Sequence, residues 1–350
     1  MKRQQEQQME IEPVTAEISS PLVIPQPDDI EEAVEIGQEE PDNHPNFIES
    51  NTSAITLEDL SDNCIVPTFA DNTLTVSHQS FIQSVMEAGQ SIFGDLTPVE
   101  CRVSHPINGR TPDALHKQAH ELLDSEKTIY YQRLAFISHV TGLSRTINDQ
   151  PVLLTIGGVR AYNEDRLFGR SCPLKYKIFV GWTVRVCSNL CLQCDGLAGN
   201  IECMTASDIK EKAESLFSSF DQTKDDNLLT LENLGRTRIN EGQFCSIIGR
   251  LRLYQNLSTA SKSELNLPQV ILGDQTVNAA VRNYVENPNF RKEEGADSIS
   301  LWQLLQLLNE AVKASYIDKW LERNQNCTDF VFGIEKAILG ESQEYAWFLK

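Results

Sequence analysis

The sequence predicts an α+β protein in which a small antiparallel sheet packs with helices and the C-terminal half is helical. The clearest evidence is a pair of apolar, β-branched segments, residues 151–162 and 175–187, which are separated by a turn-rich loop. Such a pair forms a long antiparallel hairpin, which we place at about residues 151–187. After residue 196 the apolar residues recur at helical spacing, and an amphipathic segment at residues 78–93 adds a helix before the sheet.

The segments before the hairpin carry helix start signals. Ser77 is suited to cap the helix at residues 78–93, because its hydroxyl can accept a hydrogen bond from an unpaired amide of the first turn. Thr111 followed by a proline is a second start signal and predicts a helix over about residues 113–124. Residues 128–137 are rich in β-branched and aromatic side chains, and their pattern leaves strand and helix both open.

The second strand of the hairpin shows a clear alternation. Within residues 175–187 the even positions are all apolar, whereas the odd positions include two lysines, an arginine and Phe179. Alternate residues of a strand face opposite sides of the sheet, so one face is predicted to be core and the other basic. In the first strand, Gly157 and Gly158 indicate a bulge or a close approach of another backbone.

The C-terminal half is predicted to consist of helices that begin at polar caps and bury one apolar face. The caps are Ser207, Asn240, Asp274 and either Ser298 or Ser300. The predicted helices span residues 208–220, 241–254, 275–285, 301–308, 315–323 and 328–339. The apolar residues 345–349 are expected to dock back on the core.

Charge divides the chain into distinct regions. The 350 residues carry 50 acidic and 30 basic side chains, a net charge of −20. Residues 1–60 hold 15 acids, two bases and six prolines, and are predicted to form a disordered acidic tail. Residues 61–350 are predicted to form a single α+β domain of net charge −7, in which residues 102–185 carry a net charge of +5.

Two further features bear on location. No apolar run reaches the length of about 20 residues that a membrane span needs, and residues 1–9 lack the apolar core of a signal peptide. The nine cysteines form an odd set without a secretory signal, which is typical of a reduced protein with free thiols. We therefore expect a cytoplasmic protein with no membrane partner.

The cysteines and histidines offer only weak metal candidates. Three cysteines have the spacing of the iron–sulfur triad of radical-SAM enzymes, although a glutamine precedes the third where an aromatic residue is usual. One more cysteine nearby would be the fourth ligand that zinc requires, and two histidines stand at i and i+4 of a predicted helix. These candidates are Cys187, Cys191, Cys194, Cys203, His116 and His120. The chain lacks the common nucleotide-binding, hydrolase and metalloprotease motifs, so we predict no cofactor and name no catalytic residue.

The basic hairpin is the more informative candidate site. A sheet face that carries cationic side chains and an aromatic ring can bind phosphates and stack a base. The candidate phosphate contacts are Arg160, Lys175, Lys177 and Arg185, with Phe179 as the stacking ring. The alternative interpretation is the solvated outer face of an antiparallel sheet, which has the same pattern. If the basic face does bind nucleic acid, the acidic tail could cover it as a competing polyanion.

Several segments resemble one protein family. They are SHPINGRTPDALHKQAHELLDSEKTIYYQRLAF, TIGGVRAYN, VCSNLCLQCD, QFCSIIGRLRLY and SYIDKWLERN. Over about residues 65–350 the chain resembles a family of uncharacterised Bacteroidetes proteins, domain of unknown function 3871, and its VCSN motif is similar to one of phage- and plasmid-associated proteins. The resemblance implies a mobile genetic element and a bacterial cytoplasm. It implies no known activity.

Three functional hypotheses follow. The first is a non-enzymatic accessory protein that contacts nucleic acid, or the machinery of its replication and transfer, through the basic sheet face. The second is an acidic interaction protein that mimics DNA and inhibits a host DNA-binding enzyme. The third is a metal- or thiol-dependent enzyme built on the histidine pair and the cysteine cluster.

Overall fold

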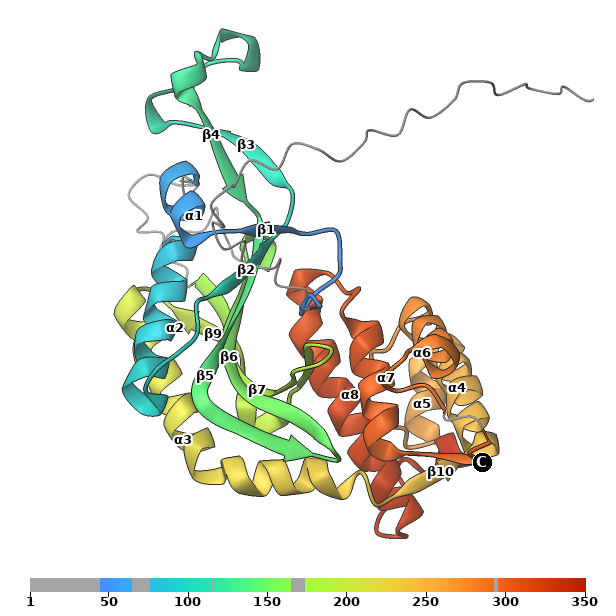
Figure 1. Cartoon of the computed structure of the whole chain (residues 1–350). Helices are drawn as coiled ribbons and strands as arrows, with labels where there is room; N and C mark the ends of the chain where they lie inside the picture. The colour runs from blue at the N-terminus through green and yellow to red at the C-terminus, as the bar shows by residue number, and fades with distance from the viewer. Residues whose placement is uncertain (1–44, 65–75, 115, 165–173, 293–294) are drawn as a thin grey trace, which may run out of the picture. The chain divides into compact units, whose positions relative to one another are not determined.

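The computed structural model describes residues 45–64, 76–114, 116–164, 174–292 and 295–350 (Figure 1). These residues belong to one compact unit, His44–Lys350. The expected disorder of residues 1–44 lies outside the described residues. The predicted boundary at residue 60 is wrong, because the chain is already folded from residue 45 onward.

The main sheet has seven antiparallel strands in the order β1-β2-β5-β6-β7-β8, and β9 also pairs with β7. This confirms the α+β class and the hairpin of β6 and β7, but the sheet is larger than predicted. It gains strands on both sides of the hairpin, one of them formed by the segment whose pattern left strand and helix open. The strands are β1 Ser53–Ile55, β2 Glu100–Val103, β5 Arg133–Ile147, β6 Gln150–Ala161, β7 Leu174–Val184, β8 Asn189–Cys191 and β9 Leu197–Cys203.

The helices confirm most of the predicted segments. Ser77, Asn240 and Ser300 each cap the predicted helix through a side-chain hydrogen bond. The helices are α1 Leu57–Asn63, α2 His78–Phe93, α3 Ala206–Asn233, α4 Glu241–Asn256, α5 Thr259–Glu264, α6 Asp274–Glu286, α7 Leu301–Val312 and α8 Ile317–Ile338. Two strand pairs lie outside the main sheet, β3 Pro106–Arg110 with β4 Lys127–Tyr131, and β10 Arg238–Asn240 with β11 Ser298–Ser300.

Three helix predictions differ from the structure. The helix expected at residues 113–124 is replaced by short 3-10 turns in the connection between β3 and β4. Two of these turns bury none of their side chains, and short helices need tertiary packing to be stable. α3 extends 13 residues past its predicted end. α8 is one continuous helix rather than two because Asn324 and Cys327, which lie between the predicted halves, are buried in it.

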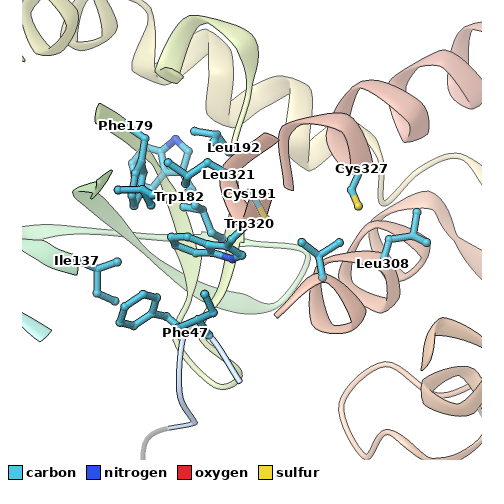
Figure 2. Packing of buried hydrophobic residues seen from close by; sticks show 14 of the residues in the cluster. Phe47, Ile137, Phe179, Trp182, Cys191, Leu192, Leu308, Trp320, Leu321 and Cys327 are labelled. Carbon is cyan, nitrogen blue, oxygen red and sulfur yellow. The ribbon is translucent and has the colours of Figure 1, made fainter. Parts of the chain in front are cut away.

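Helices cover both faces of the sheet. On the even-numbered face of β7, the Tyr176 ring lies 4.9 Å from Phe81 of α2. On the odd-numbered face, the Phe179 ring lies 5.7 Å from Trp320 of α8, which in turn packs on Phe47 (Figure 2). The predicted solvent-facing basic face is therefore wrong: α8 covers it, and β7 has no exposed residue.

A polar cluster joins the sheet to the C-terminal helices. Asn309 of α7 and Asn324 of α8 both donate to the carbonyl oxygen of Leu190 in β8, at 2.9 and 2.7 Å. Asn189 donates in return to Gln306 of α7 at 3.2 Å. Buried polar groups must find such partners, so Leu190, together with Asn189 at the end of the VCSN segment, fixes β8 against two helices. The predicted docking of the final residues is also confirmed by a 3-10 turn, Ala346–Leu349, whose Phe348 is buried.

Candidate nucleic-acid interface

Arg160 lies in the core rather than on a binding surface. Its guanidinium is enclosed between the rings of Tyr162 and Tyr176, with its central carbon 4.5 and 4.8 Å from their centroids. One nitrogen, Nη1, donates to the carbonyl oxygen of Val76. The side chain is fully buried, so it has no access to a phosphate.

Lys177 and Phe179 are likewise buried and make contacts within the fold. The Lys177 ammonium lies 3.0 Å from Glu164 Oε1 and 3.1 Å from Glu322 Oε1, and donates to the Asp318 carbonyl oxygen at 2.7 Å. Its charge is thus balanced by carboxylates between β7 and α8, while the Phe179 ring is fully buried.

The two remaining strand candidates are more accessible. Lys175 is half-buried at the start of β7, opposite Glu202 of β9, and Arg185 is exposed just beyond the other end. The five predicted residues therefore do not form one surface. Arg185 is an exposed cation outside the C-terminal half.

The metal candidates do not form a site in the described part of the chain. His116 and His120 are exposed but do not share a helix. Cys187, Cys191 and Cys203 are buried while Cys194 is exposed, and burial raises the pKa of both Cys187 and Cys191 to about 12. Among the described residues, no three His, Cys, Asp or Glu side chains are placed to hold a metal ion.

A surface hollow of about 540 Å³ lies beside β1 and β2. Its charged lining consists of Asp59, Glu100 and Arg102, and burial raises the pKa of the nearby Cys101 thiol to about 12. The lining offers no activated nucleophile with an adjacent base, which is the arrangement that covalent catalysis requires.

A second basic region is present in the C-terminal half. Residues 236–292 carry eight basic and four acidic side chains, a net charge of +4. They comprise β10, α4, α5 and α6 and lead toward β11, which pairs with β10 and brings the two ends of the region together. This segment, which we call the basic unit, is thus positively charged within an acidic chain.

Helices α4 and α6 run antiparallel within this unit. Near one end, the rings of Phe244 and Tyr284 stack with centroids 4.1 Å apart. Toward the other end, Arg252 Nη2 donates to Asn278 Oδ1, and Gln255 Nε2 donates to the Leu272 carbonyl oxygen at 3.1 Å. Later residues of α4 therefore contact earlier residues of α6 or of the segment before it, as expected for antiparallel helices.

The exposed residues of the two helices form one surface, which we call the α4–α6 face. On α4, exposed residues recur at spacings of four and three, and on α6 at spacings of three, four and three. The bond between Arg252 and Asn278 joins the two rows. The face comprises Glu241, Gly242, Cys245, Gly249, Arg252, Leu253 and Asn256 of α4 with Asp274, Gln275, Asn278, Arg282, Val285 and Glu286 of α6. It thus carries two arginines and three carboxylates, one of which, Glu241, pairs with Lys292.

Other cations of the unit have defined contacts. Arg238 donates to Ser298 Oγ and to the Ser298 carbonyl oxygen, at 3.0 and 2.8 Å. Lys292 lies 2.5 Å from Glu241 Oε2, so its charge is neutralised at the start of α4. Arg291, the residue before it, is exposed. Arg252, Arg282 and Arg291 are the exposed cations of α4, α6 and the segment that follows.

The sequence conceals this surface when charge is summed over a long segment. Residues 186–350 carry a net charge of −7, which hides the positive region at residues 236–292. Summing the charge over residues 236–292 alone reveals the net charge of +4. The antiparallel contacts that place Arg252 beside Asn278 depend on tertiary structure and have no local signal.

Comparison with known proteins identifies the family. A family model described as a domain of unknown function, B. Theta gene description (DUF3871), matches residues 30–349. The chain belongs to the DUF3871 family. No curated protein and no solved structure matches this DUF3871 chain. Over the residues that the structure describes, no helix combines the length and apolarity needed to cross a bilayer.

Proposed function

We propose that this DUF3871 protein is a non-enzymatic accessory protein that contacts nucleic acid through the α4–α6 face. The observation that carries the proposal is the net charge of +4 of residues 236–292, in which Arg252, Arg282 and Arg291 are exposed. The Bacteroidetes and mobile-element context implied by the sequence resemblance, and a cytoplasmic location, are parts of the same proposal.

The charge distribution gives this surface its physical basis. Arginine binds phosphate through a planar fork of donors, and each phosphate that it neutralises releases a condensed counterion. Residues 186–235 and 293–350 carry net charges of −6 and −5, so the positive segment at residues 236–292 is flanked in sequence by acidic segments. We expect these to weaken distant attraction and to favour a contact confined to the α4–α6 face.

Binding can be tested by fluorescence anisotropy with a labelled 20-base-pair duplex at 50 to 200 mM KCl. The test variant combines Arg252→Gln, Arg282→Gln and Arg291→Gln. A matched control combines Arg145→Gln, Arg185→Gln and Lys212→Gln, which change the same charge at exposed positions elsewhere. Each phosphate that a protein neutralises adds about 0.9 to the salt slope, so the slope of the test variant should be smaller by up to about 3.

The two variants give distinct outcomes. Weakened binding in the test variant alone supports the proposal. Equal weakening in both variants would show that the contact is nonspecific, and weakening in the control alone would move the interface to the end of β7. A wild-type protein that binds neither duplex nor single strand contradicts the proposal.

A second candidate function is DNA mimicry, which is favoured by the surface of α3. This helix carries seven acidic side chains and three lysines over 28 residues, and four of the acids are exposed. Rows of carboxylates can occupy a cationic DNA-binding cleft. Inhibition of a nuclease by protein that does not itself bind DNA would favour this function. A pull-down with and without nuclease treatment then separates protein partners from nucleic acid.

A further inference from the structure

We propose that two copies of this chain associate by exchanging an arm, so that each copy places Leu123 in the hollow beside β1 and β2 of the other. We define the arm as residues 105–131, which comprise β3, β4 and the 3-10 turns between them. The surfaces involved differ from the α4–α6 face, and the inference does not depend on the proposed function.

The arm packs little against the rest of its own chain. It extends away from the main sheet (Figure 1), and a bridge between Ile129 and Cys64 ties β4 to the residue that follows α1. Among the described residues of the arm, Ala114 and Thr128 are the buried ones. A two-stranded hairpin is marginally stable in water unless another element packs on it. A second chain that lies against the arm would supply that packing.

The tip of the arm is tied together by its own polar groups. The Glu126 carboxylate pairs with the Lys117 ammonium and accepts a hydrogen bond from the Leu123 amide at 2.9 Å. The Arg110 guanidinium donates to the Lys117 carbonyl oxygen. A contact surface that is ordered before binding loses less conformational entropy on association, so this tip is suited to bind as a preformed unit.

Leu123 is the apolar side chain that the tip presents to solvent. Its amide and its carbonyl oxygen are both hydrogen-bonded to Glu126, yet its side chain is 62% exposed. The fold thus fixes the backbone of Leu123 and leaves the side chain uncovered. Removal of this apolar area from water would favour association, in proportion to the area buried.

The hollow beside β1 and β2 can receive such a side chain. Its volume of about 540 Å³ is more than one leucine side chain fills. Most of its lining is apolar and includes Ala54, Ile55, Leu57, Pro98 and Val99. Ala54 and Leu57 are exposed, so the hollow is open to a side chain that enters from another molecule.

The positions of the hollow and the arm suit a two-fold arrangement. β3 begins three residues after β2 ends, so the hollow lies at the base of the same arm whose tip carries Leu123. Two arms that lie side by side in opposite directions bring each tip to the base of the other. Such a contact uses the same surfaces in both copies and therefore closes at a dimer. The 27 residues of the arm also match the size of a stable interface, which takes about 20–30 residues from each side.

Charge also favours this pairing. Residues 112–126 carry four acidic side chains and one lysine, a net charge of −3. In the hollow, Asp59 is hydrogen-bonded at the cap of α1 and Glu100 has a partner of its own, whereas Arg102 makes no hydrogen bond or ion pair with any described residue. Asp124 follows the inserted leucine, and its side chain is 97% exposed although it pairs with Lys127. Its carboxylate is therefore placed to meet Arg102 of the other copy.

Sedimentation equilibrium of the full chain tests the association. Wild-type protein should be a dimer at about 50 µM. Leu123→Asp should raise the dissociation constant about 100-fold or more, because each dimer loses two buried leucines. Arg102→Gln should raise it about 3- to 10-fold. Leu229→Asp makes the same change at a 50% exposed leucine of α3 and should leave the dissociation constant unchanged.

Cross-linking tests the contact itself without relying on a variant that dissociates. Leu123→Cys protein is mixed with Ala54→Cys protein and treated with a short bis-maleimide, and the linked peptides are identified by mass spectrometry. The expected product joins position 123 of one chain to position 54 of the other. Leu229→Cys protein in place of Leu123→Cys should give no product at position 54, and it shares the background from the exposed thiols of Cys194 and Cys245.

The outcomes are distinct from those of the proposed function. Wild-type protein that is a monomer at 50 µM overturns the inference. A dimer that Leu123→Asp leaves intact, or one in which position 54 links to no residue of the arm, overturns arm exchange as well. Nucleic-acid binding is measured separately with the arginine variants, so either proposal can fail while the other stands.

Discussion

The ammonium of Lys177 in β7 lies 3.1 Å from the carboxylate of Glu322 in α8, at a position where the lysine side chain is only 3% exposed. A second carboxylate, that of Glu164, lies 3.0 Å away, and Lys319 approaches both acids from the exposed side. A lysine whose alternation pattern predicts a phosphate contact is therefore an ion-pair partner that holds α8 against the sheet.

Replacement of Lys177 should be costly for stability. Lys177→Met removes the cation between two carboxylates and the bond to the Asp318 carbonyl oxygen, and breaking a buried pair costs about 3–5 kcal/mol. Because Glu322 is partly exposed, we expect about 3 kcal/mol in urea unfolding. Lys319→Met removes an exposed partner of the same acids and should cost less than about 1 kcal/mol. Equal effects of the two changes would contradict this account.

His78 should make the protein sensitive to acid. It is fully buried, its Nε2 donates to the Tyr131 carbonyl oxygen at 2.8 Å, and burial together with the nearby Arg160 guanidinium lowers its pKa to about 3. The unfolded chain binds a proton near pH 6.5 and the folded chain does not, so stability is present above pH 6.5 and falls as the pH drops toward 3.

Between pH 7 and pH 5 this single group should account for about 2 kcal/mol of lost stability. His78→Gln keeps a donor for Tyr131 but does not titrate, so its unfolding free energy should fall less over the same interval. His120→Gln, at an exposed position, serves as the control. If the wild type and His78→Gln show the same pH slope, His78 is not the group responsible.

The glycine pair in β6 should tolerate no side chain. A Cβ added to Gly157 would lie 2.2 Å from the Phe136 carbonyl oxygen and 2.7 Å from the Phe179 ring. Backbone and a buried ring cannot move without opening the sheet, so we expect Gly157→Ala to cost more than about 3 kcal/mol. Gly199→Ala in β9, where a Cβ meets nothing within 4 Å, should change the melting temperature little.

The structure shows which helix caps and which irregularities of the sheet could be predicted from the sequence. Some local signals were interpreted correctly: Ser77 and Asn240 cap their helices, and the close approach at Gly157 is real. Others were not: Thr111 begins no α-helix, and Thr205 and Gly273 are the caps where Ser207 and Asp274 were predicted. The main bulge of the sheet is elsewhere, in β5 between His139 and Ser144, where no glycine pair marks it.

The predicted binding face was wrong for a physical reason. An alternating strand shows that two faces differ, but it does not show whether a second helical layer covers the polar one. The layer is formed by α8, which is about 140 residues later in the chain than Lys177. Lys177 has the sequence pattern of a solvent-facing residue because two of its partners, Glu322 and the Asp318 carbonyl oxygen, come from a distant helix.

The acidic segment at residues 1–43 should weaken nucleic-acid binding. It carries 12 acidic and two basic side chains, a net charge of −10, which repels the phosphates of an approaching nucleic acid. Removal of these residues should raise affinity for the labelled 20-base-pair duplex about tenfold at 50 mM KCl and by less at 200 mM, where screening is stronger. The deletion stops at residue 43 because Phe47 and Ile48 belong to the core.

A variant that keeps the length of residues 1–43 but replaces the acids by Asn and Gln is the matched control. It should bind as tightly as the shortened protein if charge is the cause, since the chain still occupies the same volume. Tighter binding in the shortened protein alone would indicate steric blocking instead. In that case the affinity gain would not depend on salt, whereas electrostatic competition predicts that the gain shrinks as the Debye length falls.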